Sequence, residues 1–356
     1  MSLQPELYNP NRPMVSVQIY NYNYGHFLKD CLDSVFSQTY NNIEISFSDN
    51  ASEDDSWEIA LEYVKKYPGV MTLTRNRNNF GSDANLINCR LNARGKYSII
   101  LCSDDMLRPG YVETCVCALE SNPSAAFVMV NRTIIDEKGN RTEEPPFYNQ
   151  SCVIPGEEQA AVYMMAPVNP SISQVMYNRL IFESNMVRGP LASRWYGPRL
   201  VDFIICCFND IVYIKEPLLL HRLHCQNDSL LAADNLLEII GTYVLQHQYA
   251  DIASTYPNLD KVVDRLPASI KKLSSTCMRY CLRSLVAGKD ELGWRYYHLA
   301  VAISPSVTEE AVFKAIGKYW VSDEKGKMAI LGALKDESNL LTRAVSYDPP
   351  PGSKPL

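Results

Sequence analysis

Two adjacent carboxylates, Asp104 and Asp105, stand at the end of an apolar run from Tyr97 to Cys102 that is typical of a buried strand. Two like charges where a core meets solvent are costly unless a cation or several hydrogen-bond donors neutralise them. A hard divalent cation, bound through oxygen and bridging to substrate phosphates, is the simplest neutraliser. The alternative is that an aspartate caps the helix expected after Pro109. The pair alone leaves both interpretations open.

Two further polar turns, Tyr20–Asn23 and Ser48–Ser52, each follow an alternating apolar segment that predicts a strand, residues 14–19 and 43–47. In a parallel sheet, ligands bind at the carboxyl ends of the strands. The chain has neither the glycine-rich dinucleotide-binding motif nor a P-loop motif. We therefore expect aromatic rings, amides and carboxylates, together with a metal, to hold the ligand.

Strand and helix patterns alternate through the first 131 residues, and this alternation predicts an α/β fold. Apolar residues recur at helical spacing in four segments, with strand patterns between them. These helical segments are 26–38, 57–64, 83–93 and 109–121. The prediction is a mostly parallel sheet with helices on both faces.

Composition excludes several classes of protein. The 356 residues are 46% hydrophobic and 21% charged, as is usual for a globular chain. A net charge of -6 argues against nucleic acid as the main partner. Eleven cysteines without zinc-finger or thioredoxin spacing favour buried free thiols in a reducing compartment. Without a membrane-length apolar run or a signal pattern, the expected location is cytoplasmic, and peripheral contact with the inner face of the membrane stays open.

The chain after Ser229 shows helical patterns up to about residue 345. Part of it, between Arg265 and Lys289, is rich in lysine and arginine, which fits either a solvated helix face or a surface for a membrane or a partner. The last segment, 346–356, is rich in proline, and we expect it to be disordered.

Several blocks from Met14 to Asn131 resemble, in order and at the right intervals, the start of glycosyltransferase family 2. The blocks are Val15–Asn23, Phe27–Val35, Ser37–Tyr40, Asn42–Ile45, Asp49–Ser52, Arg75–Gly81, Ala93–Tyr97 and Ser103–Asp105. The resemblance is weaker around Val201–Phe203 and Glu216–His224, and it ends at Ser229. It departs from the usual pattern at Tyr20-Asn21, where Pro-Thr is common, and at Asn50, where a second Asp is common.

The resemblance implies the GT-A fold, a Rossmann-like nucleotide-sugar-binding domain, over residues 14–228. Its nucleotide-sugar half would be 14–131 and its acceptor half 132–228. A tail of 1–13 would precede it, and the helical region 229–345 would follow.

The same resemblance implies roles for five residues of the first half. Tyr20 and Tyr22 would contact the nucleoside, and Asp49 would accept a hydrogen bond from its base. Asp105 would bind the metal, Mn²⁺ or Mg²⁺, and Asp104 the ribose or a metal-bound water. A uracil imide needs an acceptor such as Asp49, but guanine also presents N–H groups. Helix capping is the alternative for Asp49.

In the second half, Arg222 is expected to contact the pyrophosphate and His224 the metal, since both lie in a polar segment after a predicted strand. Asp202, before a strongly apolar run, is the candidate general base that takes the acceptor proton. The alternatives are that Asp202 caps the next helix and that Asp210 is the base.

Together these features predict an inverting, metal-dependent glycosyltransferase. The donor would be a nucleoside-diphosphate sugar, with a UDP-sugar favoured, and the acceptor a hydroxyl of a saccharide or a lipid-linked saccharide. The expected setting is polysaccharide or glycolipid synthesis. Two alternatives stay open: a binding or scaffold protein that kept the fold without activity, and a sugar nucleotidyltransferase.

Overall fold

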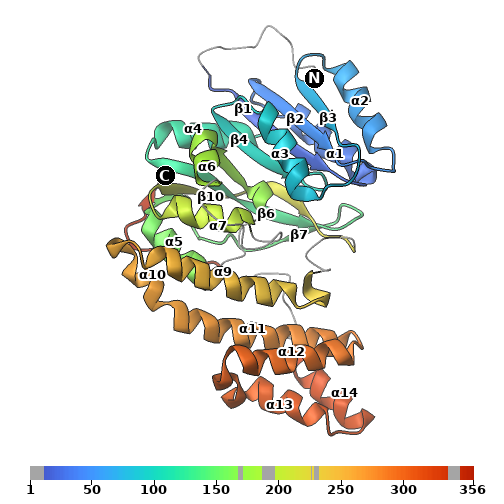
Figure 1. Ribbon diagram of the computed structural model, residues 1–356, viewed down its shortest axis with the longest axis vertical. Coiled ribbons are helices and arrows are strands. Elements are labelled where there is room, and N and C mark those ends of the chain that lie inside the picture. The colour runs from blue at the N-terminus through green and yellow to red at the C-terminus, as the bar shows by residue number, and fades with distance from the viewer. Residues whose placement is uncertain (1–11, 167–170, 187–196, 226, 228–231, 336–344) are drawn as a thin grey trace.

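The computed structural model describes residues 12–166, 171–186, 197–225, 227, 232–335 and 345–356 (Figure 1). The strands are β1 (Val15–Asn21), β2 (Ile43–Asp49), β3 (Met71–Arg75), β4 (Tyr97–Cys102), β5 (Met106–Leu107), β6 (Ala125–Ile135), β7 (Arg141–Glu143), β8 (Cys152–Ile154), β9 (Val175–Asn178), β10 (Asp210–Arg222) and β11 (Lys354–Pro355). Over these ranges the sheet order is β11-β8-β10-β6-β9-β4-β1-β2-β3, with β5 added to β10 and β7 added to β6.

Most of the long strands of this sheet pair in parallel. β1 pairs in parallel with both β2 and β4, β2 pairs in parallel with β3, and β10 pairs in parallel with β6. β9 runs antiparallel between β4 and β6, and β8 runs antiparallel to β10. The predicted fold class, a mostly parallel α/β sheet followed by a helical region, is confirmed.

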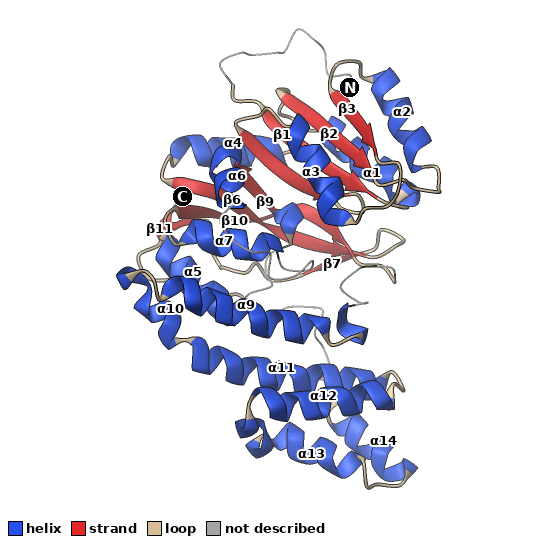
Figure 2. Cartoon of the chain, in the orientation of Figure 1, coloured by secondary structure: helices blue, strands red, loops and turns tan. Residues whose placement is uncertain are grey.

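Helices cover both faces of this sheet (Figure 2). They are α1 (Gly25–Phe36), α2 (Ser56–Lys66), α3 (Ser82–Asn92), α4 (Tyr111–Ser121), α5 (Gly156–Met165), α6 (Arg179–Met186) and α7 (Gly197–Cys206). Successive strand residues point to opposite faces, so Ile99 joins a core that includes α1, α2 and α4, while Ile100 joins one that includes α5 and α7. Both faces of β4 are therefore buried, which explains its continuous apolar sequence.

The helical region extends away from the sheet at the bottom of Figure 1. Its helices are α9 (Leu237–Ala253), α10 (Asp260–Asp264), α11 (Leu266–Val286), α12 (Asp290–Ile303), α13 (Ala311–Tyr319) and α14 (Glu324–Ala333). α9 and α10 pack on the second core of the sheet, and α11 to α14 form a third core that also includes Ile239 of α9. Among the described helices, none is both long enough and apolar enough to cross a bilayer.

The predicted disorder of 346–356 is wrong. Lys354 and Pro355 form β11, which pairs antiparallel with β8, and Tyr347 forms a bridge with Tyr148. The Tyr347 ring also lies 5.5 Å from the Phe147 ring. Proline-rich composition suggested an unfolded tail, but an open sheet edge offers backbone partners to any extended segment that reaches it.

Candidate functional site

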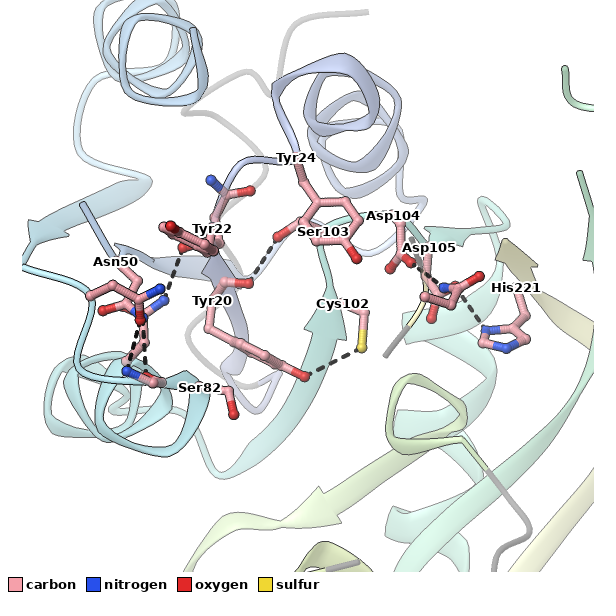
Figure 3. A pocket seen from close by; sticks show the side chains of 15 residues that line it. Tyr20, Tyr22, Tyr24, Asn50, Ser82, Cys102, Ser103, Asp104, Asp105 and His221 are labelled. Carbon is pink, nitrogen blue, oxygen red and sulfur yellow. Dashed lines mark hydrogen bonds and ion pairs between the residues drawn. The ribbon is translucent and has the colours of Figure 1, made fainter. Parts of the chain in front are cut away.

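The carboxyl ends of β1, β2 and β4 meet at one edge of the sheet. Because β1 lies between the other two strands, Asn21 stands beside Asp49 and Tyr20 beside Cys102. A cavity of about 330 Å³ opens at this edge (Figure 3). Its lining residues are Tyr20, Asn21, Tyr22, Tyr24, Asn50, Asn79, Gly81, Ser82, Asn85, Cys102, Ser103, Asp104, Asp105, His221 and Asn227.

Asp105 is fully buried, and its two carboxylate oxygens differ. Oδ1 accepts a hydrogen bond from the Arg222 backbone N–H at 3.0 Å and lies 2.9 Å from Nδ1 of His221. Oδ2 is buried and has no hydrogen-bond partner among the residues that the structure describes. Burial raises the pKa of this carboxyl, but the charge and hydrogen bond of His221 outweigh burial and hold the pKa of Asp105 below its ordinary value.

Asp104 is held from a different direction. Its Oδ2 lies 3.0 Å from Nε2 of His224 and accepts a hydrogen bond from Asn227 at 3.2 Å. The His224 ring is fixed between aromatic rings, 5.4 Å from Tyr24 and 4.9 Å from Phe27. His224, the predicted metal ligand, thus contacts Asp104, and His221 instead lies beside Asp105.

Arg222 holds the acidic turn through contacts on the side away from the cavity lining. Its guanidinium donates to the backbone oxygens of Asp104 and Asp136 and pairs with Asp30 at 3.0 Å, while it lies 4.4 Å above the Phe27 ring. The side chain is 3% exposed. The sequence predicted a direct pyrophosphate contact, but Arg222 is not among the described residues of the cavity lining. Its position fixes the turn that carries the carboxylates.

Tyr20 and Tyr22 line the cavity, as the sequence predicted, and Tyr24 adds a third ring (Figure 3). Tyr22 is 39% exposed, so one part of its ring is open to a ligand. The Tyr20 hydroxyl lies 3.5 Å from Sγ of Cys102. The first polar turn therefore presents flat, partly apolar surfaces of the kind that stack on a nucleobase.

Asp49 lies buried behind the cavity wall. Its carboxylate accepts hydrogen bonds from Asn21 and from both the backbone N–H and the hydroxyl of Ser52, and Nε of Arg75 lies 3.3 Å away. It is not part of the lining as far as the chain is described. In this conformation the carboxylate holds the turn after β2, and Asn50 is the residue of that turn that faces the cavity.

A network of asparagines supports this wall. Asn50 donates to Asn79 at 2.7 Å and accepts from Asn76 at 2.8 Å, and Asn85 donates to the backbone oxygens of Asn21 and Ser48. Sequence reasoning missed these lining amides. The sequence held one indication of them. Asn79 and Asn85 flank Gly81, which directly precedes α3 near the predicted ligand edge.

Asp202 lies outside the cavity lining that the structure describes. It is fully buried within α7, where Oδ1 accepts from the Tyr177 hydroxyl at 2.8 Å and Oδ2 pairs with Arg199 at 2.8 Å. Burial raises the pKa of Asp202 despite the charge of Arg199. The alternative role as a helix cap is wrong, because α7 begins at Gly197.

Asp210, the other candidate base, begins β10 at the end opposite His221. It accepts hydrogen bonds from Ser124 at 3.0 Å and from the Gly156 backbone at 3.4 Å. It thus ties α5 to the sheet, and it too lies apart from the described lining.

The acidic turn fits a divalent cation. Candidate ligand atoms of Cys102, Asp104 and Asp105 lie within 4.8 Å of one another. The buried, unpartnered Oδ2 of Asp105 is costly by itself, and a cation would satisfy it. The geometry thus favours a cation site at Asp104 and Asp105 over helix capping. α4 begins at Tyr111, and its cap carries no side-chain hydrogen bond.

A mostly parallel sheet with a polar cavity and an acidic turn at its strand ends is typical of the class of α/β proteins that bind ligands at this edge. Its fold is similar to that of S. aureus TarS residues 1–349 in complex with UDP-GlcNAc, with a TM-score of 0.54 and 13% identity. That match covers 79% of this chain and 89% of the other. The fold is GT-A.

Sequence comparison agrees with this class. The chain is 34% identical over 128 residues to chondroitin synthase of Escherichia coli, which covers 36% of this chain and 18% of that protein. It is 34% identical over 102 residues to glycosyltransferase GlyG of Streptococcus pneumoniae, which covers 28% and 33%. The chain spans less than half the length of the first curated relatives it matches.

Residues 16–183 match the family model described as Glycosyl transferase family 2. This segment, just under half of the chain, is thus similar to glycosyltransferase family 2.

Proposed function

We propose that this protein transfers a sugar from a UDP-sugar to a hydroxyl group of a saccharide or lipid-linked saccharide, with inversion at the anomeric carbon. The observation that carries the proposal is the acidic turn after β4, where Asp105, with one buried oxygen that has no hydrogen-bond partner among the described residues, helps to line a cavity that also contains tyrosines and amides. Residues 14–228 would form the transferase domain.

The cavity supplies the two kinds of contact that a nucleoside diphosphate needs. Tyr22 presents a partly exposed ring on which a base can stack, and Asn50 and Asn85 present amides at the wall. The structural relative TarS was crystallised with UDP and with UDP-GlcNAc, which supports a uridine nucleotide for this fold. Asp49 holds the wall from behind through its contacts with Ser52 and Arg75.

Asp104 and Asp105 would hold Mn²⁺ or Mg²⁺, which neutralises the charge that develops on the departing diphosphate. The protein's own part is to keep both carboxylates in place. His221 and the Arg222 backbone fix Asp105, while His224 and Asn227 fix Asp104. We assign His224 a positioning role through Asp104.

Asp202 was the predicted general base for the proton of the acceptor hydroxyl. Asp202 is fully buried and paired with Arg199, so an acceptor hydroxyl cannot reach it in this conformation. We propose that Asp202 stabilises the core between α7 and β9, where Tyr177 binds it.

The names of two relatives support a proposal about the pathway. One is named chondroitin synthase, an enzyme of a polysaccharide, and another a glycosyltransferase of Streptococcus pneumoniae. We propose that the acceptor belongs to polysaccharide or glycolipid assembly.

Calorimetry with UDP, with and without Mn²⁺, tests the donor site directly. We expect UDP to bind at least tenfold more tightly with Mn²⁺. A panel of nucleotide sugars, assayed for slow hydrolysis and then for transfer to oligosaccharides, identifies the donor. Metal-dependent UDP binding without hydrolysis or transfer of any donor would indicate the non-catalytic binding protein. Absence of metal-dependent UDP binding would overturn the proposal.

A further inference from the structure

Cys102, the last residue of β4, brings a thiol to the acidic turn. In Figure 3 its side chain lies between Tyr20 on one side and Asp104 and Asp105 on the other. It lines the cavity together with both carboxylates. The nearest ligand atoms of the three residues lie within 4.8 Å of one another.

This distance is close to what one cation requires. Sulfur and oxygen ligands lie about 2.0–2.3 Å from Zn²⁺, so two ligands of one ion lie within roughly 4–4.6 Å of each other. Small side-chain rotations of Cys102 and Asp104 would therefore bring all three atoms to one point. Asp105 contributes a buried oxygen, Oδ2, which no described residue satisfies with a hydrogen bond.

The neighbours of the sulfur also suit a ligand. The Tyr20 hydroxyl lies 3.5 Å from Sγ and can donate to it, as outer-shell groups commonly do to metal-bound thiolates. Tyr20 is itself fixed, because the Ser103 hydroxyl donates to its backbone oxygen at 2.9 Å.

A thiolate changes which cation such a site prefers. Carboxylates alone suit Mg²⁺ and Mn²⁺, whereas a thiolate suits softer ions such as Zn²⁺ and Cd²⁺. A thiol that coordinates a metal does so as the thiolate, and its proton passes to solvent.

We propose that Cys102 is a third ligand of the cation at Asp104 and Asp105, and that the site therefore binds Zn²⁺ or Cd²⁺ more tightly than Mg²⁺ or Mn²⁺. The inference rests on the proposed function only in placing a cation at this turn. It adds a specificity-determining residue, since the thiol sets the choice of metal.

Cobalt and cadmium report thiolate ligands through charge-transfer absorption in the near ultraviolet. Three full-length proteins would be compared: the parent, Cys102→Ser and Cys117→Ser. Each would be titrated with Co²⁺ or Cd²⁺ alone, with a phosphine present to keep the thiols reduced. Cys117 is exposed on α4, which makes it a matched control for losing one thiol. We expect charge-transfer absorption in the parent and Cys117→Ser, and its loss in Cys102→Ser.

A second variant tests metal choice without removing a ligand. In Cys102→Asp, three carboxylates replace the mixed set, so the preference for Zn²⁺ over Mn²⁺ should fall at least tenfold in competition calorimetry. Equal charge-transfer amplitude in the parent and Cys102→Ser, or an unchanged Zn²⁺/Mn²⁺ ratio in Cys102→Asp, would overturn the proposal.

The two proposals fail separately. If Mn²⁺-dependent UDP binding persists while Cys102→Ser keeps the charge-transfer signal, the thiol is not a ligand and the donor site stands. If the parent gives the signal and Cys102→Ser loses it, but UDP binding does not depend on metal, the cation site stands and the transferase proposal falls.

Discussion

Asp105 and Asp202 are both fully buried aspartates, and their partners give them different properties. Asp105 lines the cavity, with one oxygen bound by His221 and Arg222 and one that has no hydrogen-bond partner within the described part of the chain. Asp202 has one oxygen bound by Tyr177 and the other paired with Arg199. A buried carboxylate is a candidate metal ligand when its protein partners leave one oxygen unsatisfied at a cavity. A buried carboxylate whose charge is balanced by an arginine inside the core, as in Asp202, has a structural role.

The pKa directions show the same contrast. The pKa of Asp202 is raised, because burial outweighs the attraction of Arg199. The pKa of Asp105 is lowered, because His221 and the backbone N–H of Arg222 outweigh its burial. Asp105 thus favours its ionised form although its side chain is fully buried.

Replacing Asp202 should have the largest effect, on stability. Asp202→Asn leaves the guanidinium of Arg199, 6% exposed, without its counter-charge. Breaking such a buried pair costs about 3–5 kcal/mol. Chemical denaturation should show this loss, and calorimetry on the folded fraction should give parental UDP affinity. Parental stability with transfer slowed by roughly 10²–10⁴ would instead make Asp202 the general base that the sequence predicted.

Replacing Asp105 should act on binding. Asp105→Asn can still accept the hydrogen bond from the Arg222 backbone but loses the charge for the cation. Mn²⁺-dependent UDP affinity should fall about a hundredfold, equivalent to about 2.7 kcal/mol. Asp210→Asn, at the other end of β10, is the matched carboxylate control and should bind UDP as the parent does. A parental Mn²⁺–UDP thermal shift in Asp105→Asn would remove Asp105 from the metal site.

Replacing Tyr22 should weaken nucleotide binding more modestly. A ring stacked on a base contributes about 1–3 kcal/mol, so Tyr22→Ala should lower UDP affinity roughly tenfold, while Tyr22→Phe keeps it. Tyr243 on α9 is 37% exposed, close to the 39% of Tyr22, and Tyr243→Ala is the control. Equal affinities in Tyr22→Ala and Tyr243→Ala would show that no base stacks on Tyr22.

The pH dependence of stability should show the smallest effect, with opposite signs for the two carboxylates. An unfolded aspartate has a pKa of about 3.9. Asp105 has a lower pKa when folded, so its stabilisation is present above about pH 4 and is lost as the pH falls below that. Asp202 has a raised pKa, so its contribution is fully present below about pH 4 and is lost as the pH rises through the folded pKa.

Unfolding free energies measured from pH 3 to pH 7 check both signs. Asp105→Asn should flatten the acid limb of the profile, and Asp202→Asn should remove the decline above pH 4. Profiles parallel to that of the parent in both variants would contradict the two pKa directions.

The alternation of strands and helices up to Asn131 was predictable from the sequence, because each segment there buries a periodic apolar face. The position of Tyr20, Tyr22 and the acidic pair at one edge of the sheet was predictable too, because the carboxyl ends of parallel strands lie at the same edge. Contacts across the chain were not predictable in this way. The segment around Arg222 was recognised as polar, but nothing local indicated that its guanidinium would lie under Asp104.

One alternative and one prediction are wrong for physical reasons that the sequence contains. The capping alternative for Asp202 takes the helix to begin at the apolar run from Phe203, yet Gly197-Pro198 is a better start, since proline is favoured in the first helical turn. The tail was expected to be unfolded on composition alone, although β8 offered it an unpaired edge.

The clamps on the acidic turn also bear on the order in which the molecule folds. Asp105 is separated by 116 residues from His221 and by 117 from Arg222, so their contacts are strongly non-local. Non-local contacts require the closure of long loops and form late, after helices and neighbouring strands. The proposed cation site would therefore be complete only when β10 has joined β6, and metal affinity would rise with the last stage of folding. The rate of Cd²⁺ binding during refolding would therefore report the rate at which β10 pairs with β6.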